Sequence, residues 1–383
     1  MNRVPAIRFG GFTDPWEQRK LGEIVDVCGG KDYKHLKPGS IPVYGTGGLM
    51  TYVDEALSKN EDAIGIGRKG TIDRPYKLHA PFWTVDTLFY AVPRTNIDIE
   101  FALSCFLRIN WKTKDESTGL PSLSKNAISD TQLLIPDARE QHQIGALFRN
   151  LDSLITLHQR KYDKLRTMKK SMLDKMFPKP GEFFPEIRFE GFTDPWEQRK
   201  ALHLASYSKG KGYSKDDLTE SGTPVILYGR LYTKYESVIE EVDTFVDASN
   251  DGIYSHGDEV IVPASGETAE DIARASAVAQ PGVLFGGDLN ILRPNKSITS
   301  LFMALSLSNG TAQKELSKRA QGKSVVHVHN SDIQDVTISY PTIDEQTQIG
   351  AFFRSLDSLI TLHQRKLELL KNVKKSLLDK MFV

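Results

Sequence analysis

The stretch GFTDPWEQRK at Gly11–Lys20 occurs a second time, without change, at Gly191–Lys200. A second stretch, LDSLITLHQRK, stands at Leu151–Lys161 and again at Leu356–Lys366. The first pair is 180 positions apart and the second pair is 205 apart, so the sequence between the two motifs is 25 residues longer in the second copy. The chain is therefore an internal repeat whose unit is a whole domain followed by a helix.

Each copy closes on a segment whose apolar residues follow a helical period. Spacings of four and three residues alternate over 144–176 and over 349–381. A sustained period of about 3.5 residues predicts two long helices with a coiled-coil seam. The seam residues are Ile144, Phe148, Leu151, Ile155, His158 and Leu165 in the first helix, and Ile349, Phe353, Leu356, Ile360, His363 and Leu370 in the second. We expect the two histidines to fix the register, and we expect Lys169 and Lys374 to be favoured by the helix dipole near the C-termini.

The segments between the motifs contain short apolar runs broken by glycine turns, which predicts mixed α/β domains with more strand than helix. The expected strands lie within Pro42–Gly48, Glu61–Ile72, Thr223–Tyr235 and Asp258–Thr268. Both segments end in a stretch that we expect to be extended, LSKNAISDTQLLIP at 123–136 and VHVHNSDIQDVTISYP at 326–341. These two stretches align when Pro136 is matched to Pro341, although few letters agree.

The sequence thus predicts an α+β chain with a pseudo-two-fold internal repeat, in which two mixed α/β domains are separated by two long antiparallel helices forming a coiled coil. The expected boundaries are 1–138 for the first domain with its N-terminal frame, 139–177 for the first long helix, 178–190 for a connector, 191–343 for the second domain, and 344–383 for the second long helix.

Composition limits the class of protein. The chain has 383 residues, with 49 Lys and Arg against 49 Asp and Glu. No apolar run approaches the length of a membrane span, and the N-terminus lacks the apolar core of a secretory signal. Two cysteines, Cys28 and Cys105, are expected to be buried free thiols, and we expect a cytoplasmic protein. The neutral total conceals a basic excess in the helices, because 141–177 holds eight Lys and Arg against three acidic residues.

Catalytic motifs are weak or incomplete. The TDPW motif lacks the second proline of an amino-methyltransferase signature, and we interpret Trp16 and Trp196 as anchors that join each domain to its frame. The glycines of Gly65–Gly70 fit a dinucleotide-binding spacing, but no helical pattern follows them. His327 and His329 share one face of an expected strand, without further ligands in sequence. We therefore expect no catalytic residue and no metal.

The repeated frames carry a resemblance to a known family. The stretch FTDPWEQRK ahead of a variable segment, and EQHQIGALFRNLDSLITLHQRK or EQTQIGAFFRSLDSLITLHQRK after it, resemble the specificity subunit of Type I restriction-modification complexes. The resemblance covers essentially the whole chain. It implies a non-catalytic subunit whose two target-recognition domains read a bipartite, asymmetric site in double-stranded DNA. It also implies two modification subunits and restriction subunits as partners, with S-adenosylmethionine, ATP and Mg bound by those partners and no cofactor on this chain.

Physical reasoning from the repeat leads to the same expectation. Two related units can dock on successive exposures of one DNA groove, and identical frames present the same surface to two copies of one partner. Base discrimination requires side chains with suitable donors and acceptors. The candidates in the first domain are Tyr44, Thr46, Arg68, Lys69, Arg74, Ser122, Ser124 and Lys125. The candidates in the second domain are Tyr228, Arg230, Tyr232, Lys234, Ser265, Glu267, Lys323, His327 and His329.

Two other classes of protein remain open from the residues alone. The chain could be a coiled-coil adaptor with two ligand-binding domains that bind no DNA, in which case the basic helices are solvated faces. It could also be a single-chain enzyme that joins recognition and catalysis, although it has no glycine-rich cofactor loop.

Overall fold

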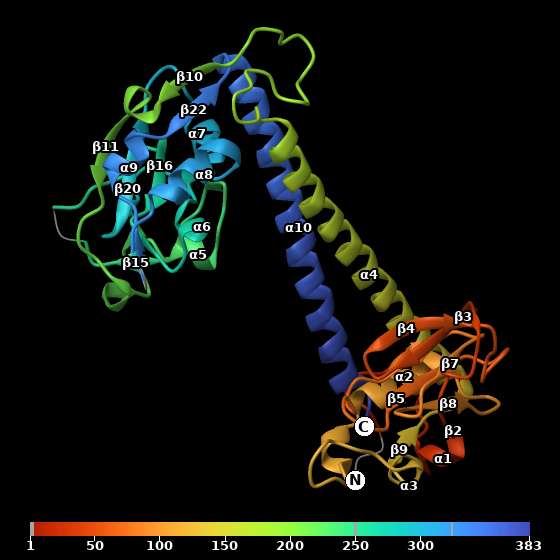
Figure 1. Ribbon diagram of the computed structural model, residues 1–383. Helices are drawn as coiled ribbons and strands as arrows, with labels where there is room; N and C mark the ends of the chain where they lie inside the picture. The colour runs from red at the N-terminus through yellow and green to blue at the C-terminus, as the bar shows by residue number, and fades with distance from the viewer. Residues whose placement is uncertain (1–3, 249–250, 323–324) are drawn as a thin grey trace. The chain divides into compact units, whose positions relative to one another are not determined.

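The computed structural model describes residues 4–248, 251–322 and 325–383, and it contains two compact units. The first unit consists of the chain up to Gln159 together with Arg365–Val383, and the second consists of Arg160–Gln364. Two long helices, α4 (Ala138–Lys175) and α10 (Ile343–Met381), are the most extended elements of the chain (Figure 1). Each unit therefore combines one α/β domain with the beginning of one long helix and the end of the other.

The α/β domain of the first unit is built on three small sheets. A four-stranded antiparallel sheet has the order β2-β8-β5-β6, a three-stranded sheet has the order β4-β3-β7, and β1 pairs with β9. The strands are β1 (Glu17–Lys20), β2 (Val25–Gly29), β3 (Pro38–Gly45), β4 (Gly48–Val53), β5 (Ala63–Gly67), β6 (Tyr76–Leu78), β7 (Trp83–Thr84), β8 (Leu88–Pro93) and β9 (Gln132–Ile135). The helical elements are α1 (Leu21–Ile24), α2 (Ile99–Arg108), the 3-10 turn η1 (Trp111–Lys114) and α3 (Lys125–Ser129).

The second unit repeats this plan with additions. Its main sheet has the order β11-β20-β16-β18-β14, a four-stranded sheet has the order β12-β15-β13-β19, and β10-β22 and β17-β21 are two-stranded. The strands are β10 (Glu197–Lys200), β11 (Ala205–Lys209), β12 (Leu218–Thr219), β13 (Thr223–Ile226), β14 (Val238–Ile239), β15 (Phe245–Val246), β16 (Glu259–Pro263), β17 (Ser265–Gly266), β18 (Ser276–Val278), β19 (Leu284–Phe285), β20 (Leu289–Pro294), β21 (Val326–His327) and β22 (Thr337–Tyr340). The helical elements are η2 (Ala201–His203), η3 (Lys215–Asp217), α5 (Arg230–Thr233), α6 (Ala269–Ile272), α7 (Ser300–Leu307), α8 (Gly310–Arg319) and α9 (Asn330–Gln334).

The long helices run antiparallel within each unit. In the first unit, Lys374 near the end of α10 forms an ion pair with Asp152 near the beginning of α4, with Nζ and Oδ1 2.6 Å apart. In the second unit, Lys169 near the end of α4 pairs with Asp357 in the same way. The sequence pattern predicted only that the helix dipole favours these lysines near the C-termini. Their carboxylate partners could not be predicted, because each partner lies about 200 residues away along the chain.

Seam burial is greatest where each long helix begins. The first three seam residues of α4, Ile144, Phe148 and Leu151, are buried, as are their counterparts Ile349, Phe353 and Leu356 in α10. The later seam residues are half-buried: Ile155, His158, Leu165, Ile360, His363 and Leu370. The beginning of each helix therefore belongs to the core of the domain that precedes it.

The phenylalanine that follows each long helix packs into the core of the domain that belongs to the other repeat. Phe382 packs against Trp16, Phe101 and Phe148, with ring centroids 5.9, 5.5 and 6.0 Å away. All of these side chains are buried in one apolar cluster of the first unit.

The second unit contains the equivalent aromatic cluster. Phe177 lies 5.9 Å from Trp196, 5.4 Å from Phe302 and 6.5 Å from Phe353. The expected role of the repeated tryptophan as an anchor is confirmed, since both tryptophans are almost completely buried. The chain thus uses the same aromatic contact twice.

Local structure differs from expectation at three places. The stretch Thr223–Tyr235 is a strand only over β13, and it then turns into the one-turn helix α5. The two terminal stretches are interrupted by α3 and α9. At the start of α3, the hydroxyl of Ser124 accepts a hydrogen bond from the amide of Ala127 at 3.0 Å. Such N-terminal capping stabilises a helical turn in competition with extended structure.

Two further properties concern the whole chain. Within the described residues, none of the helices combines the length and apolar character that a membrane crossing requires. Both cysteines are free, but only Cys105 is buried, while Cys28 is half-buried because it lies in β2 near an edge of its sheet.

Candidate nucleic-acid interface

Two stretches with several candidate residues meet in the first domain, where the chain leaves β5. The amide of Arg68 donates to the carbonyl of Thr87 at 2.8 Å, and the carbonyl of Arg68 accepts the amide of Leu123 at 2.9 Å. Lys69 forms an antiparallel bridge with Ser122. The backbone therefore holds Arg68 and Lys69 beside the stretch that leads into α3.

The second domain repeats these hydrogen bonds after β16. The amide of Ala264 donates to the carbonyl of Asp288 at 2.8 Å, and its carbonyl accepts the amide of Val328 at 3.0 Å. Ser265 pairs with His327 in the β17–β21 ladder. Equivalent backbone positions are thus occupied by Arg68, Lys69 and Ser122 in the first domain, and by Ala264, Ser265 and His327 in the second.

We call this feature the matched edge, formed by 68–70 and 121–124 in the first domain and by 264–266 and 326–329 in the second. The match of Ser122 to His327 follows from the hydrogen bonds, and it is the same match that aligning Pro136 with Pro341 produces. The backbone frame is shared while the side chains that it carries differ, which is the arrangement that two readers of different sequences require.

Arg68 is held in place by contacts that do not occupy its full hydrogen-bonding capacity. Its guanidinium carbon lies 5.7 Å from the centre of the Phe89 ring, and Nη1 donates to the carbonyl of Asp86 at 3.4 Å. The side chain is exposed. A guanidinium with four remaining donor hydrogens can still bind a guanine edge or a phosphate.

In the second domain, the matched edge is supported by a residue that the sequence analysis missed. Asn290 is buried in β20, and its Nδ2 donates to the carbonyl of Val328 at 2.9 Å. Ser265 Oγ lies 3.2 Å from Nδ1 of His327, and the hydroxyl of Tyr232 donates to the carbonyl of Ser265 at 2.7 Å. His327 is exposed, so its ring is positioned but still accessible. No sequence motif marks Asn290, because its role depends on a strand pairing between distant segments.

Arg230 occupies a different environment from the one that a DNA-reading role requires. Its side chain is buried, Nη1 donates to Asp243 at 2.6 Å, and Nη2 donates to Glu236 at 2.8 Å. A hydrogen bond from Lys234 and a smaller contribution from Arg230 lower the pKa of Asp243 to about 2. Arg230 and Lys234 thus form a charged network around α5, and this arrangement favours a structural role for Arg230.

The remaining candidates divide between packed and exposed positions. Tyr44, Thr46, Ser122 and Ser124 are half-buried, and Tyr44 packs against Tyr76 with ring centroids 6.1 Å apart. The exposed candidates are Lys69, Arg74, Lys125, Tyr228, Lys234, Glu267 and His329. Tyr232 is half-buried, with Arg274 over its ring. Lys323 lies outside the described residues.

Lys31 in the β2–β3 loop is a further cation at this side of the first domain, and the sequence analysis overlooked it. Its amide donates to the carbonyl of Thr84 at 2.9 Å, beside the turn that holds Arg68. Within the described parts of the chain, Lys31, Arg68 and Lys69 have no carboxylate partner, although many other basic side chains do. Cations without internal partners are available for phosphate.

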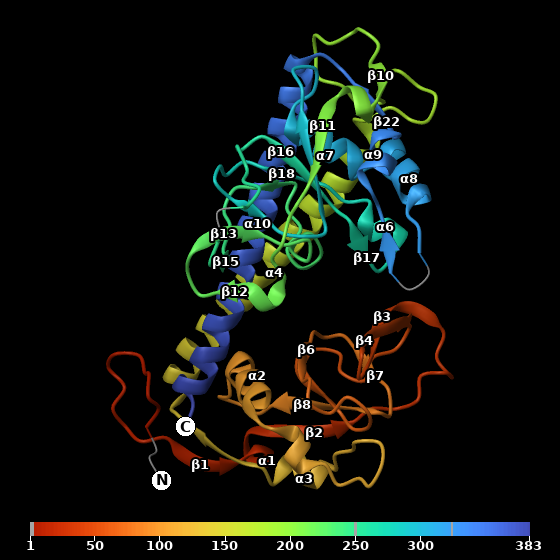
Figure 2. The same cartoon turned by 90° about the vertical axis from the view of Figure 1, so that its left-hand side faces the viewer.

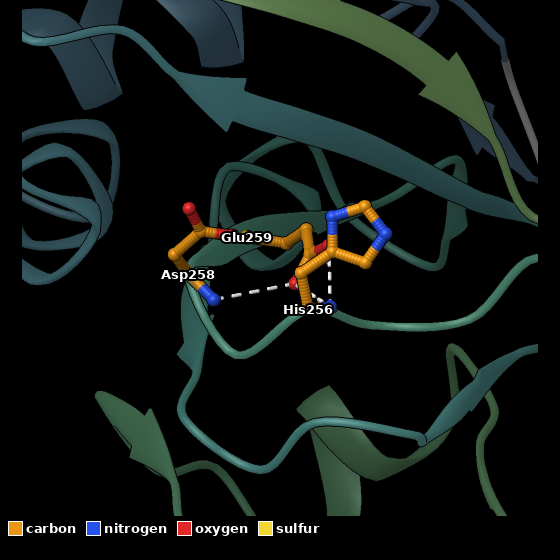
Figure 3. Close-up of side chains that lie close together, drawn as sticks. All are labelled: His256, Asp258 and Glu259. Atoms are coloured by element: carbon orange, nitrogen blue, oxygen red, sulfur yellow. Dashed lines mark hydrogen bonds and ion pairs between the residues drawn. The ribbon is translucent and has the colours of Figure 1, made fainter.

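A cluster of His256, Asp258 and Glu259 lies at the beginning of β16 and has the composition of a metal site (Figure 3). The carboxylate of Glu259 is buried, and it accepts the amides of His256 at 2.8 Å, Gly257 at 3.2 Å and Asp258 at 3.3 Å. Arg293 Nε donates to the same carboxylate at 3.3 Å. Because protein donors already surround this carboxylate, we interpret the cluster as the anchor of a turn.

Comparisons with known proteins agree with this geometry. A family model described as "Type I restriction modification DNA specificity domain" matches residues 13–167 and 193–372. The chain is 22% identical over 280 residues to the Type I restriction enzyme MjaVIII specificity subunit of Methanocaldococcus jannaschii, a match that covers 70% of this chain and 65% of that relative's length. The crystal structure of the S subunit of a Type-I restriction-modification system from M. genitalium matches with a TM-score of 0.68 and 15% identity, over 99% of both chains. At that identity the structural likeness concerns the fold.

Proposed function

Because this chain belongs to the family of Type I restriction modification DNA specificity domains, we propose that it is a specificity subunit that reads a bipartite, asymmetric DNA target. Each α/β domain reads one half of the target through its matched edge. The observation that carries the proposal is the pair of edges, in which the same backbone hydrogen bonds present Arg68, Lys69 and Ser122 in one domain, and Ala264, Ser265 and His327 in the other.

The proposal assigns catalysis to partner subunits. The chain would recruit two modification subunits, which bind S-adenosylmethionine, and restriction subunits, which use ATP and Mg. It would itself bind double-stranded DNA and no cofactor, and it would act in the cytoplasm, where the DNA is. The charged and polar groups of the matched edges support DNA binding.

Exposed leucines on the long helices support the recruitment of two copies of one partner. Leu154 and Leu157 on α4 are 43% and 45% exposed, and the corresponding Leu359 and Leu362 on α10 are 43% and 44% exposed. These residues belong to the identical stretch LDSLITLHQRK, so each unit presents the same apolar face. We propose that each pair docks one modification subunit, since a repeated surface binds a repeated partner.

Charged substitutions at one leucine pair should remove one modification subunit. We expect Leu154→Asp with Leu157→Asp to leave a complex with one modification subunit instead of two, because burying two carboxylates in an apolar interface is strongly unfavourable. The matching pair, Leu359→Asp with Leu362→Asp, should remove the other. Native mass spectrometry of the co-purified complex counts the subunits. Thr156→Asp is the control, because Thr156 is exposed on another face of the same turn. Two bound subunits in both double variants would contradict this docking surface.

DNA binding by the purified chain tests the central proposal. The chain is mixed with duplex DNA with and without its modification subunit, and the target is read from methylated adenines in cells that express both. We expect one bipartite target and specific binding by the complex. Absence of DNA binding in both mixtures would favour the coiled-coil adaptor instead.

Arg68→Ala should relax one base position in one half of the target. If Arg68 binds a guanine edge, the loss is about 1–3 kcal/mol at that position. If it binds phosphate, affinity should fall for all sequences, and the slope of log affinity against log salt should fall by about one unit. Binding curves over a set of single-base variants at several salt concentrations distinguish the two. An unchanged curve and salt slope would remove Arg68 from the interface.

His327→Ala provides the matched control in the other domain. We expect it to relax a position in the opposite half-site from Arg68→Ala and to leave the first half unchanged, because the two edges belong to separate domains. If both substitutions relaxed the same half-site, the assignment of one edge to each half would be wrong.

A further inference from the structure

The β3–β4 hairpin of the first domain ends in two exposed apolar side chains. Leu49 is 52% exposed and Met50 is 55% exposed. Gly45 pairs with Gly48 at the end of the ladder, and Gly48 has φ of +109°, which L-residues rarely adopt. A Cβ at Gly45 would lie 2.6 Å from Sδ of Met50, so glycine at this position gives Met50 room at the tip.

This hairpin tip stands beside the matched edge. The turn that follows β7 joins them, because the amide of Val85 donates to the carbonyl of Tyr44 at 3.0 Å, while the carbonyl of Thr87 accepts the amide of Arg68 at 2.8 Å. Lys31 reaches the same turn through its hydrogen bond to Thr84. Figure 2 shows that β3, β4 and β7 of the first domain form a separate small sheet, and this sheet carries the hairpin.

The surroundings of the tip combine apolar and cationic side chains. Leu120, which is 67% exposed, lies next to Pro121, whose carbonyl accepts the amide of Gly70 at 2.8 Å. Two segments thus contribute exposed cations without carboxylate partners in the described chain, Lys31 from one and Arg68 and Lys69 from the other. Two further segments contribute exposed apolar tips. Phosphates complement the cations, and base faces or thymine methyl groups complement the apolar tips.

We propose that Leu49 and Met50 form an apolar wedge that packs against base faces in the first half-site and partly opens one base step. The proposal rests on the proposed function, because it takes DNA as the occupant of this surface. Leucine and methionine side chains that enter between base pairs unstack them and kink the duplex. The cost of opening depends on the base step, so the wedge would select sequence at a position that no hydrogen bond reads.

Within its described residues, the second domain does not repeat the hairpin. After β13, which corresponds to β3 by its parallel pairing with β19, the chain enters the charged network around α5. Tyr228 is an exposed aromatic side chain there, and its ring meets that of Tyr232 edge-on, with centroids 6.4 Å apart. We therefore expect opening of a base step by a wedge in the first half-site only.

Because a methyltransferase extrudes its target base, the probe positions leave out the methylated adenines and their neighbours. The test uses the full chain with its modification subunit and duplexes that carry 2-aminopurine, one position at a time, at the other positions of both half-sites. The fluorescence of this base rises when it loses its stacking neighbours. We expect a rise at one step of the half-site that Arg68→Ala relaxes. The double variant Leu49→Ala with Met50→Ala should lose the rise and bind roughly tenfold more weakly or worse, with the second half-site still read. Leu107→Ala, at an exposed leucine of α2, is the control and should behave as the unaltered chain.

The outcomes separate this inference from the proposed function. A fluorescence rise that the double variant abolishes supports the wedge. A rise that survives in the double variant, or specific binding without any rise, overturns the wedge and leaves the DNA-reading function intact. Loss of the modification subunit in the double variant also overturns the wedge, because the tip would then be a protein-docking surface. Absence of specific DNA binding by the unaltered complex overturns both.

Discussion

Phe382→Ala is expected to destabilise the first unit by about 3–5 kcal/mol while leaving the second unit nearly unaffected. Phe382 is buried among Trp16, Phe101 and Phe148, so the truncation removes the ring that three other aromatic side chains contact. Phe177→Ala should do the reverse, because Phe177 fills the equivalent position among Trp196, Phe302 and Phe353. The two variants therefore form a matched pair within one chain.

Hydrogen exchange followed by mass spectrometry measures both units at once. Amides of β5 report on the first unit, and amides of β16 report on the second, since both strands are buried along their whole length. Leu369→Ala is the control on the same tail, because Leu369 is 62% exposed. If Phe382→Ala and Phe177→Ala lowered the protection of the same strand, it would be wrong that Phe382 belongs to the core of the first unit and Phe177 to the core of the second.

Replacement of residues 21–138 by the corresponding segment of a relative is expected to change one half of the DNA target and to preserve the other. Two of the hydrogen bonds between frame and segment use main-chain atoms on the segment side. Gln141 accepts the amide of Asp98 and donates to the carbonyl of Pro136, and Gln346 makes the same two bonds with Thr299 and Pro341 in the second unit. Main-chain contacts of this kind tolerate a changed sequence, as the two copies already demonstrate.

The frame itself is held by contacts that the exchange leaves in place. Arg8 forms a bidentate ion pair with Glu140, in which Nε and Nη2 each donate to a carboxylate oxygen at 2.7 Å. Arg188 forms the same bidentate pair with Glu345. Sequencing of methylated adenines in cells that carry the hybrid and the modification subunit reads the outcome. The reciprocal exchange of residues 201–343 should change the other half. An active hybrid in which both halves changed together would defeat the idea of two independent readers.

Much of the architecture could be predicted from repetition and periodicity. The two identical motifs define a repeat, and the alternating spacings of four and three predict the long helices that appear as α4 and α10. The alignment of Pro136 with Pro341 also pairs Ser122 with His327, which the hydrogen bonds of the matched edge bear out. These features are local or regular along the chain, so they are visible without knowledge of distant contacts.

The tertiary structure alone decided which distant groups meet. The segments around Trp16 and Trp196 are identical, so sequence cannot tell which of them receives Phe177 and which receives Phe382. The burial of Arg230 depends on Glu236 and Asp243 folding around α5, and the support of the matched edge by Asn290 depends on the pairing of β20 with β16. Composition and periodicity describe single elements, whereas burial and partnership are properties of the packing between elements. That packing buries Arg230 in a charged network in one domain and leaves Arg68 exposed in the other.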